Sequence, residues 1–446
     1  MALATPAVRP DVTRRVVLLC FLGILAEGYD VGVMGAILPT LATDPHWRLS
    51  PLELGTLTSY ALLGMLVGGA LCGTLSDMYG RKRLFLACLT LFSLSMGAAA
   101  VAPTPGWFGL ARFVGGIGLG GIIPVAAALT LEYSPDARKS LNYGLMYSGY
   151  SLGLVAAALA AMAVVPVWGW RGVVALGLVP LLLVPAVARW LPESVESLVA
   201  RGDLAGAGRL AAELGLPAGS LPAPAARPVP LGLRRALALM FGPGRRRATA
   251  CFWVSLFMGM LLVYGLGAWL PQIMRRSGYD LGPALMFLAV FALSSAAGGI
   301  VMGQLADRRG VRLVVGVSFL IGAVAIDALG FKGPMALTYA LVAVAGIGTV
   351  SASLVLCSLV ANYFEPEARA TVLGWALSFA RLGAICGPVI AGAVQQWGGG
   401  PLWSFHVFAG AALIAGVAVL LIPARTPQVV RPAASGAIPL PAGRAG

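Results

Sequence analysis

Residues 22–41 read LGILAEGYDVGVMGAILPTL, and the architecture of the whole chain can be worked out from them. As a helix this stretch is long enough to cross a lipid bilayer, since about 20 apolar residues span the hydrocarbon core. Two carboxylates, Glu27 and Asp30, lie near its middle, where a charge costs roughly 2.5–3.5 kcal/mol on insertion scales. Residues three apart share one helical face. Crossing a membrane does not require these acids, so we expect other spans to enclose this face and the protein to use it.

The composition predicts an all-α polytopic membrane protein. Of the 446 residues, 59% are hydrophobic and 11% are charged, whereas a soluble domain has about 25% charged residues. The apolar runs lack the strict alternation of barrel strands. The net charge of +14 would suggest nucleic acid for a soluble protein, but membrane orientation explains it better here. The six cysteines lie in apolar runs without metal-site spacing, so neither disulfides nor a metal site is expected.

Short polar breaks divide the chain into twelve expected spans. A cytoplasmic N-terminus (1–15) precedes a six-helix bundle (16–191), a cytoplasmic linker with an amphipathic helix (192–247), a second six-helix bundle (248–423) and a disordered cytoplasmic tail (424–446). The spans are predicted at 16–41, 52–76, 84–103, 107–131, 141–166, 171–191, 248–273, 282–306, 312–331, 334–361, 370–396 and 402–423.

The cationic residues favour one orientation. If the chain starts inside and alternates sides, most arginines and lysines fall in inner segments, including Arg81-Lys82-Arg83 and Arg245-Arg246-Arg247. The pair Arg275-Arg276 is a local exception. The positive-inside rule then places both termini in the cytoplasm. We expect a multi-pass protein of a bacterial inner membrane.

The two halves repeat one another. Gly116-Ile117-Gly118 returns as Gly346-Ile347-Gly348, and Gly73-Thr-Leu-Ser-Asp77 returns at the same separation as Gly303-Gln-Leu-Ala-Asp307. Six spans per repeat give both halves the same orientation. In this architecture the substrate site lies near the midplane between the halves.

These features resemble the major facilitator superfamily. The motif Gly73–Arg83 between spans 2 and 3, its degenerate copy Gly303–Arg312 and Pro192-Glu193-Ser194 after span 6 carry the resemblance. It implies the major facilitator fold over about residues 16–424, with no enzymatic activity and no cofactor beyond a proton gradient.

Within the superfamily the chain looks most like the aromatic acid:proton symporters. Their Asp-Gly-x-Asp motif in span 1 is matched by Glu27-Gly28-Tyr29-Asp30, with Glu27 in place of the usual aspartate. Arg112-Phe113 begins the glycine-rich motif of span 4. Arg381-Leu-Gly383 begins the span 11 motif, which ends in Gly387-Pro388.

The charged residues inside the spans are candidates for substrate and proton binding. Arg381 either binds a substrate carboxylate, which its planar fork matches, or pairs with an acid elsewhere. Asp30 either carries the coupled proton or forms a fixed salt bridge, and Glu27 titrates together with it or in its place. Arg112 is either a second anion contact or a partner for Glu27. Further candidates for substrate contact are Tyr147, Tyr150, Tyr29, Ser378 and Tyr264.

A second group of charges lies at the inner surface and predicts a gate. Carboxylates near helix ends with cations opposite them form a latch that can open. We expect this latch to hold the outward-open state. The gate residues are Asp77, Gly73, Arg81, Arg83, Asp307, Arg308, Glu132 and Arg138.

The sequence therefore predicts a monomeric secondary transporter that imports a small aromatic carboxylate with protons by alternating access. Its partners are this organic anion, protons and the lipid bilayer, with no nucleic acid. Two alternatives stay open: a proton-coupled carrier of another organic acid or metabolite, and a drug or metabolite:proton antiporter. Antiporters of the superfamily tend to carry Gly-Pro in span 5, which is absent here. The sequence does not name the acid, the proton stoichiometry, or which of Glu27 and Asp30 carries the proton.

Overall fold

The computed structural model describes residues 9–214, 238, 240–242, 245–364 and 366–423, and these are helical apart from short connections. Eleven helical segments in this part of the chain are long and apolar enough to cross a membrane. The longest, Asp136–Trp190, has 55 residues and turns at Gly169. The φ of Gly169 is +64°, a conformation that suits glycine. This segment thus supplies two crossings, and the predicted all-helical membrane fold is confirmed.

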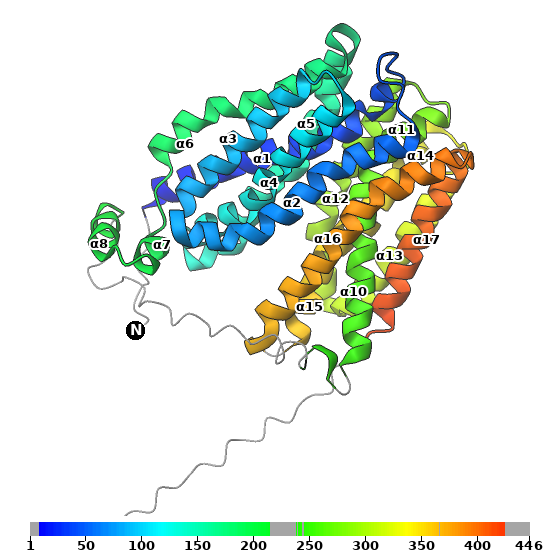
Figure 1. Ribbon diagram of the computed structural model, residues 1–446. Helices are drawn as coiled ribbons and strands as arrows, with labels where there is room; N and C mark the ends of the chain where they lie inside the picture. Colours follow the sequence, from blue (N-terminus) through cyan, green and yellow to red (C-terminus); the bar gives the residue numbers. More distant parts are fainter. Residues whose placement is uncertain (1–8, 215–237, 239, 243–244, 365, 424–446) are drawn as a thin grey trace, which may run out of the picture.

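Helices α1–α6 form the first bundle and α10–α17 form the second (Figure 1). The first contains α1 (Pro10–Leu41), α2 (Pro51–Tyr79), α3 (Arg81–Ala100), α4 (Pro105–Glu132), η1 (Asp136–Arg138), α5 (Lys139–Ala175), η2 (Leu176–Leu183) and α6 (Val184–Trp190). The second contains α10 (Arg246–Leu261), η3 (Leu262–Leu266), α11 (Gly267–Arg276), α12 (Leu281–Arg309), α13 (Val311–Ala328), α14 (Met335–Gly346), η4 (Ile347–Ser351), α15 (Ala352–Tyr363), α16 (Pro366–Gln396) and α17 (Gly400–Leu420).

The segment between the bundles differs in detail from the expected single amphipathic helix. It contains two short helices, α7 (Val195–Ala200) and α8 (Leu204–Glu213), each started by a side-chain cap, from Ser194 and Asp203. The Pro-rich part of the linker and the expected disordered tail lie outside the described residues. Helix α1 begins at Pro10, earlier than expected, because Pro at the first helical position suits a helix start.

Glycines let the helices of each bundle approach closely. A Cβ at Gly116 of α4 would collide with the carbonyl oxygen of Ala61 in α2, and a Cβ at Gly64 would collide with the carbonyl oxygen of Phe113. Close approach through small residues is typical of helices packed in membranes, where no hydrophobic effect drives helices together. The glycine-rich motif of span 4 therefore has a packing role in this fold.

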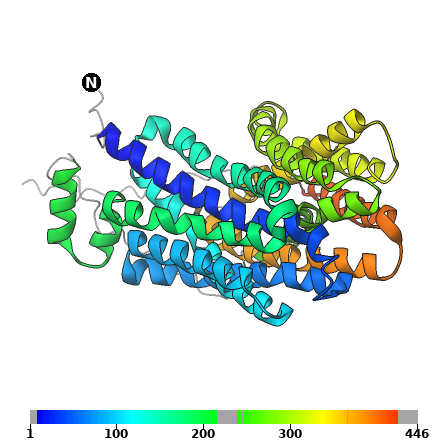
Figure 2. The same ribbon diagram turned by 90° about the horizontal axis from the view of Figure 1, so that it is seen from above.

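The two bundles meet at one end and diverge at the other (Figure 1). Seen from above, α2 and α16 lie side by side between the bundles (Figure 2). We call the end with loop 42–50 the closed end and the end with α8 and α15 the open end. At the closed end the hydroxyl of Ser59 donates to the carbonyl of Ile385 at 2.7 Å. A Cβ at Gly392 would collide with the carbonyl oxygen of Pro51.

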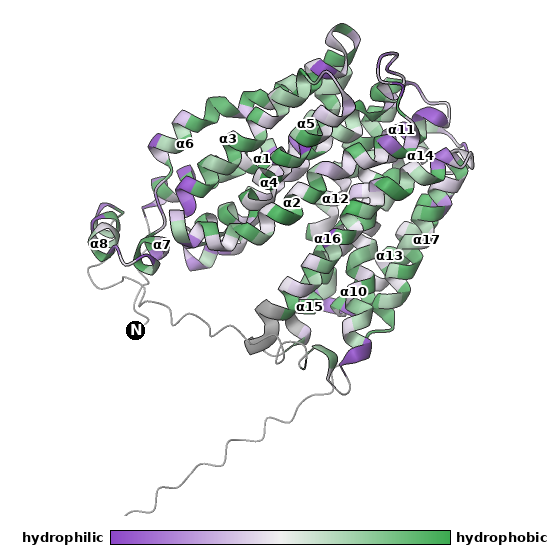
Figure 3. Ribbon diagram, in the orientation of Figure 1, coloured by the Kyte–Doolittle hydropathy of each residue, from purple (hydrophilic) through white to green (hydrophobic). Residues whose placement is uncertain are grey.

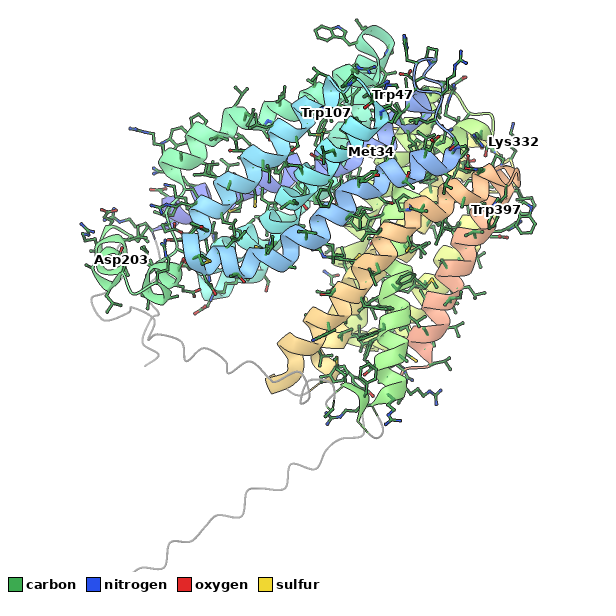
Figure 4. The ribbon with its side chains drawn as sticks, viewed as in Figure 1. Met34, Trp47, Trp107, Asp203, Lys332 and Trp397 are labelled. Atoms are coloured by element: carbon green, nitrogen blue, oxygen red, sulfur yellow. The ribbon has the colours of Figure 1, made fainter. Side chains whose placement is uncertain are left out.

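An aromatic cluster covers the closed end of the first bundle. Trp47, Phe108 and Trp170 pack edge-to-face or tilted, with ring centroids 4.9–5.8 Å apart. The guanidinium of Arg171 lies 4.3 Å from the Trp170 ring. Burial raises the pKa of Asp44, but hydrogen bonds from Trp170 and two backbone amides outweigh it and lower that pKa overall. Figure 4 places Trp47, Lys332 and Trp397 around the closed end and Asp203 at the opposite end.

Hydropathy along the ribbons follows the expected membrane boundaries. Apolar residues cover the middle of the helices, and hydrophilic residues gather at their ends and in the loops (Figure 3). The charged residues inside the spans are therefore exceptions to a clear pattern.

The glycine crossing at the closed end yields a testable prediction. We expect Gly392→Trp to weaken closure of this end by about 1–3 kcal/mol, the usual cost of overpacking. A Ser59→Cys reporter in a background without native cysteines should then react faster with a membrane-impermeant maleimide. Gly410→Trp is the control, because a Cβ at Gly410 has nothing within 4 Å. Equal labelling of the reporter in both variants would contradict the role of this crossing.

Candidate functional site

The best-defined polar contact inside the membrane is an ion pair between α1 and α4. Arg112 Nη1 lies 2.5 Å from Asp30 Oδ1, and Nη2 donates to the Asp30 carbonyl at 3.2 Å. The side chains are 3% and 2% exposed. Arg112 therefore pairs with Asp30 and not with Glu27, which corrects one of the two expectations for this arginine. Asp30 was expected either to carry the proton or to form a fixed salt bridge. In this conformation it forms the salt bridge.

Glu27, one turn away on α1, has no such partner. It is fully buried, and neither carboxylate oxygen has a hydrogen-bond partner within the described residues. The charged groups that act on it most strongly are Arg381 and Asp30. The phenols of Tyr147, Tyr150 and Tyr264 also lie within electrostatic range. An ionised carboxylate in this position is costly, so the site favours either a proton on Glu27 or a nearby positive charge.

Arg381 supplies that positive charge from α16. Its side chain is half-buried, and Nη1 donates to the backbone carbonyl of Met65 in α2 at 3.1 Å. A Cβ at Gly69 would lie 3.3 Å from Nη2, so the guanidinium occupies the seam between α2 and α16. In the part of the chain that the structure describes, Arg381 forms no ion pair, and its charge is available to an anion.

A cavity of about 940 Å³ lies between the bundles. Met34 and Gly35 of α1 and Arg112 of α4 contribute to its first-half wall, together with much of α5. The second half contributes Tyr264, residues of α12 and residues of η4 and α15. Both π-helical turns, η3 and η4, border it, and such turns often mark functional sites. Figure 4 shows Met34 in the interior between the bundles.

Tyrosines form a stacked row along the α5 wall of the cavity. Tyr143 and Tyr147 have ring centroids 6.2 Å apart with planes inclined by 10°, and Tyr147 and Tyr150 follow at 6.0 Å and 21°. Tyr150 also interacts through its hydroxyl with Tyr264 of the second half. Flat rings in this order offer faces on which another aromatic ring can stack.

The structure separates the predicted substrate residues into two groups. Arg112, Tyr147, Tyr150 and Tyr264 line the cavity. Tyr29 does not, because its hydroxyl donates to the carbonyl of Val173 at 2.7 Å inside the first bundle. Ser378, Glu27, Asp30 and Arg381 are not among the lining residues either, although Met65, the hydrogen-bond partner of Arg381, is.

Serine hydroxyls in the cavity wall were not predicted from the sequence. Ser295, Ser353 and Ser358 line the second-half wall, and Ser148 and Ser151 line the first. Ser295 donates to Phe291 of its own helix at 2.5 Å and keeps acceptor capacity for a ligand. Serines on the interior face of apolar helices were the available signal, but such residues also serve helix packing.

The predicted gate residues lie at the open end. Arg81 pairs with Glu132 at 2.7 Å and with Glu196 at 2.9 Å, so the structure brings two predicted gate residues together. Among the described residues, the exposed side chains of Asp77, Arg83, Arg138, Asp307 and Arg308 form no ion pair. Gly73 is unobstructed, because a Cβ at this position would have nothing within 4 Å, and Asp307 lines the cavity. A latch across the two bundles is absent from this described, open-ended conformation.

Comparisons with known proteins show the family and the fold of this chain. The family model described as Major Facilitator Superfamily matches residues 20–326 and 283–444. The inward-open conformation of the xylose transporter XylE from E. coli matches with a TM-score of 0.72 at 18% identity, covering 94% of this chain and 98% of that one. At that identity the match shows the fold.

Similar proteins of known function are transporters. The chain is 32% identical to the benzoate transport protein of Acinetobacter baylyi, covering 85% of this chain and 82% of that protein. It is 34% identical to the gallate transporter of Pseudomonas putida, covering 91% and 90%. It is also 34% identical to the 4-hydroxybenzoate transporter PcaK of Pseudomonas aeruginosa, covering 91% and 92%. The chain is therefore a membrane transporter and not an enzyme, and it belongs to the major facilitator superfamily.

Proposed function

We propose that this protein imports a small aromatic carboxylate together with protons, by alternating access in a bacterial inner membrane. The observation that carries the proposal is the neighbourhood of Glu27, a buried carboxylate without a hydrogen-bond partner, and Arg381, a cation without an ion pair among the described residues. The tyrosine row beside them supplies stacking faces for a ring. Relatives named as benzoate, gallate and 4-hydroxybenzoate transporters support an aromatic acid as substrate.

Charge neutrality couples the proton to the anion. With Glu27 ionised and no substrate, the charges of Glu27 and Arg381 cancel. With Glu27 protonated, Arg381 is neutralised by the substrate carboxylate instead. If only the proton or only the anion binds, a net charge is left in a low-dielectric site, which is costly. The neutral forms are thus those with both ligands or with neither, and this condition produces symport.

Glu27 therefore carries the proton in this proposal. Asp30 stays ionised and balances the charge of Arg112 throughout the cycle. Asp30 Oδ1 is paired with Arg112, which also donates to the Asp30 backbone carbonyl. Neither carboxylate oxygen of Glu27 has a hydrogen bond within the described residues. The substrate carboxylate approaches Arg381 by replacing the Met65 carbonyl as acceptor. Arg112 borders the cavity, but its side chain is 3% exposed and its charge is balanced by Asp30, so Arg381 is the cation left for the anion.

The open end faces the cytoplasm in this proposal, because the predicted inner segments carry most of the cationic residues. When the bundles rock together at this end, Asp77, Arg83, Asp307 and Arg308 approach one another and form the latch of the outward-open state. The proton gradient supplies the energy, and a single chain contains both bundles and the whole site.

Uptake into proteoliposomes tests the function. With an acidic exterior, we expect accumulation of benzoate and 4-hydroxybenzoate, abolished by an uncoupler, and little uptake of hexanoate, which lacks a ring. The lumen should acidify as substrate enters. Lumen alkalinisation on substrate entry would indicate exchange, and equal uptake of hexanoate would contradict aromatic selectivity.

Glu27→Gln tests the proton site, because glutamine resembles the protonated acid at every pH. We expect this variant to retain exchange of internal for external substrate, to lose proton-driven accumulation, and to bind substrate with an affinity independent of pH between about 5 and 8. Wild-type affinity should fall as pH rises through that range, because binding requires the protonated carboxyl. Proton-driven accumulation at the wild-type rate in Glu27→Gln would rule out this carboxyl as the proton carrier.

The Asp30–Arg112 pair predicts a stability effect of a different kind. Removing one member leaves the other as an unpaired buried charge, which typically costs about 3–5 kcal/mol. Asp30→Asn and Arg112→Gln should therefore each lower the melting temperature of the detergent-purified protein markedly, and the double variant should recover much of the loss. Additive losses in the double variant would show that the two side chains do not depend on each other.

A further inference from the structure

An apolar groove runs along the outer surface of the second bundle, away from the cavity between the bundles. It has a volume of about 430 Å³ and lies between α10 and α17. Its lining side chains are Ala250, Cys251, Val254, Leu413, Ile414, Val417, Ala418 and Leu421, all of them apolar or weakly polar. Several are half-exposed, including Leu413 at 51% and Val417 at 43%. A surface of this kind within a membrane span contacts lipid.

Arginines mark one end of this groove. Arg247 precedes Ala250, Cys251 and Val254 by three, four and seven residues, so it shares their helical face. The side chain of Arg247 is exposed, one turn before the first lining residue of α10. Arg246 donates through Nε to the Phe241 carbonyl at 2.8 Å, which leaves its terminal nitrogens available. Neither Arg246 nor Arg247 forms an ion pair within the described residues.

The length of the groove fits one leaflet. Helix α10 begins at Arg246, and Val254 lies eight residues further along, about 12 Å at roughly 1.5 Å per residue. Half of a hydrocarbon core of roughly 30 Å is about 15 Å. The open-end tip of α10 is hydrophilic, and the adjoining part of the helix is apolar (Figure 3). A cationic end therefore leads into an apolar channel of about the depth of an acyl chain.

We propose that this groove is a binding site for an anionic phospholipid, with the headgroup phosphate on Arg246 and Arg247 and one acyl chain along α10 and α17. A guanidinium binds phosphate through two parallel hydrogen bonds. An anionic lipid brings the net negative charge that two arginines require, whereas the ammonium of phosphatidylethanolamine cancels the charge of its own phosphate. The site is separate from the transport cavity, and the inference does not depend on the substrate or on proton coupling.

Native mass spectrometry of the detergent-purified full chain tests this site. Dioleoyl phosphatidylglycerol and dioleoyl phosphatidylethanolamine are added at equal concentration, so that only the headgroups differ. We expect wild-type protein to retain more phosphatidylglycerol. Arg246→Gln combined with Arg247→Gln should lower its affinity for phosphatidylglycerol roughly fivefold per arginine, without a comparable change for phosphatidylethanolamine.

The matched control is Arg275→Gln combined with Arg276→Gln, which removes the same charge from the last turn of α11. This control should keep the preference for phosphatidylglycerol. Ala250→Phe fills the groove from its exposed side and should reduce retention of both lipids, and soluble glycerol 3-phosphate should compete weakly. Equal binding of the two lipids to wild type, equal losses in the two arginine variants, or full competition by glycerol 3-phosphate would overturn the proposal.

Discussion

A guanidinium inside a helical bundle requires a counter-charge, and the chemistry of this site follows from how two arginines meet that requirement. Arg112 has Asp30 at 2.5 Å, with both side chains almost fully buried. Arg381 has only the backbone carbonyl of Met65 among the described residues, and Glu27 lies nearby without a hydrogen bond. In the structure one cation is neutralised by an ion pair and the other has none among the described residues; in the proposed cycle the second is neutralised in turn by Glu27 and by the substrate carboxylate.

This division of roles connects the site to the movement of the bundles. Arg381 lies on α16, and its hydrogen bond joins α16 to α2 of the other bundle. Glu27 lies on α1 in the first bundle. The distance between Glu27 and Arg381 depends on how the two bundles sit relative to each other. The Asp30–Arg112 pair, in contrast, lies within the first bundle and moves with it. In the proposed cycle, proton and anion therefore bind at the contact between α2 and α16, which must rearrange when the two bundles move.

Much of the fold was predictable from the sequence, because apolar runs of membrane length, the repeated glycine motifs and the polar breaks are local features. The partner of Asp30 was not predictable. The spacing of Glu27 and Asp30 indicates a shared face of α1, but which arginine meets which acid depends on the axial register of α1 against α4. Contacts with distant segments help to set the position of α4, such as its close approach to α2, where Gly116 faces the backbone carbonyl of Ala61.

Some of the expected substrate residues line the cavity and others do not, and the reason is similar. Tyr147 and Tyr150 line the cavity because the three- and four-residue spacing of the α5 tyrosines aims them along one face. Tyr29 lies beside the acids in the sequence, yet its hydroxyl reaches the Val173 carbonyl, a contact between positions 144 residues apart. The gate residues could be located from charge alone, but their pairing depends on which end of the bundles is closed.

The number of protons taken up with each substrate anion is the sharpest test of joint neutralisation at Glu27 and Arg381. It is measured by titrating the purified protein with 4-hydroxybenzoate in a calorimeter, in buffers of different ionisation enthalpy at neutral pH. If proton and anion neutralise the two side chains together, the heat should vary with the buffer by an amount that corresponds to nearly one proton taken up per anion. A binding heat that is the same in every buffer would contradict the account.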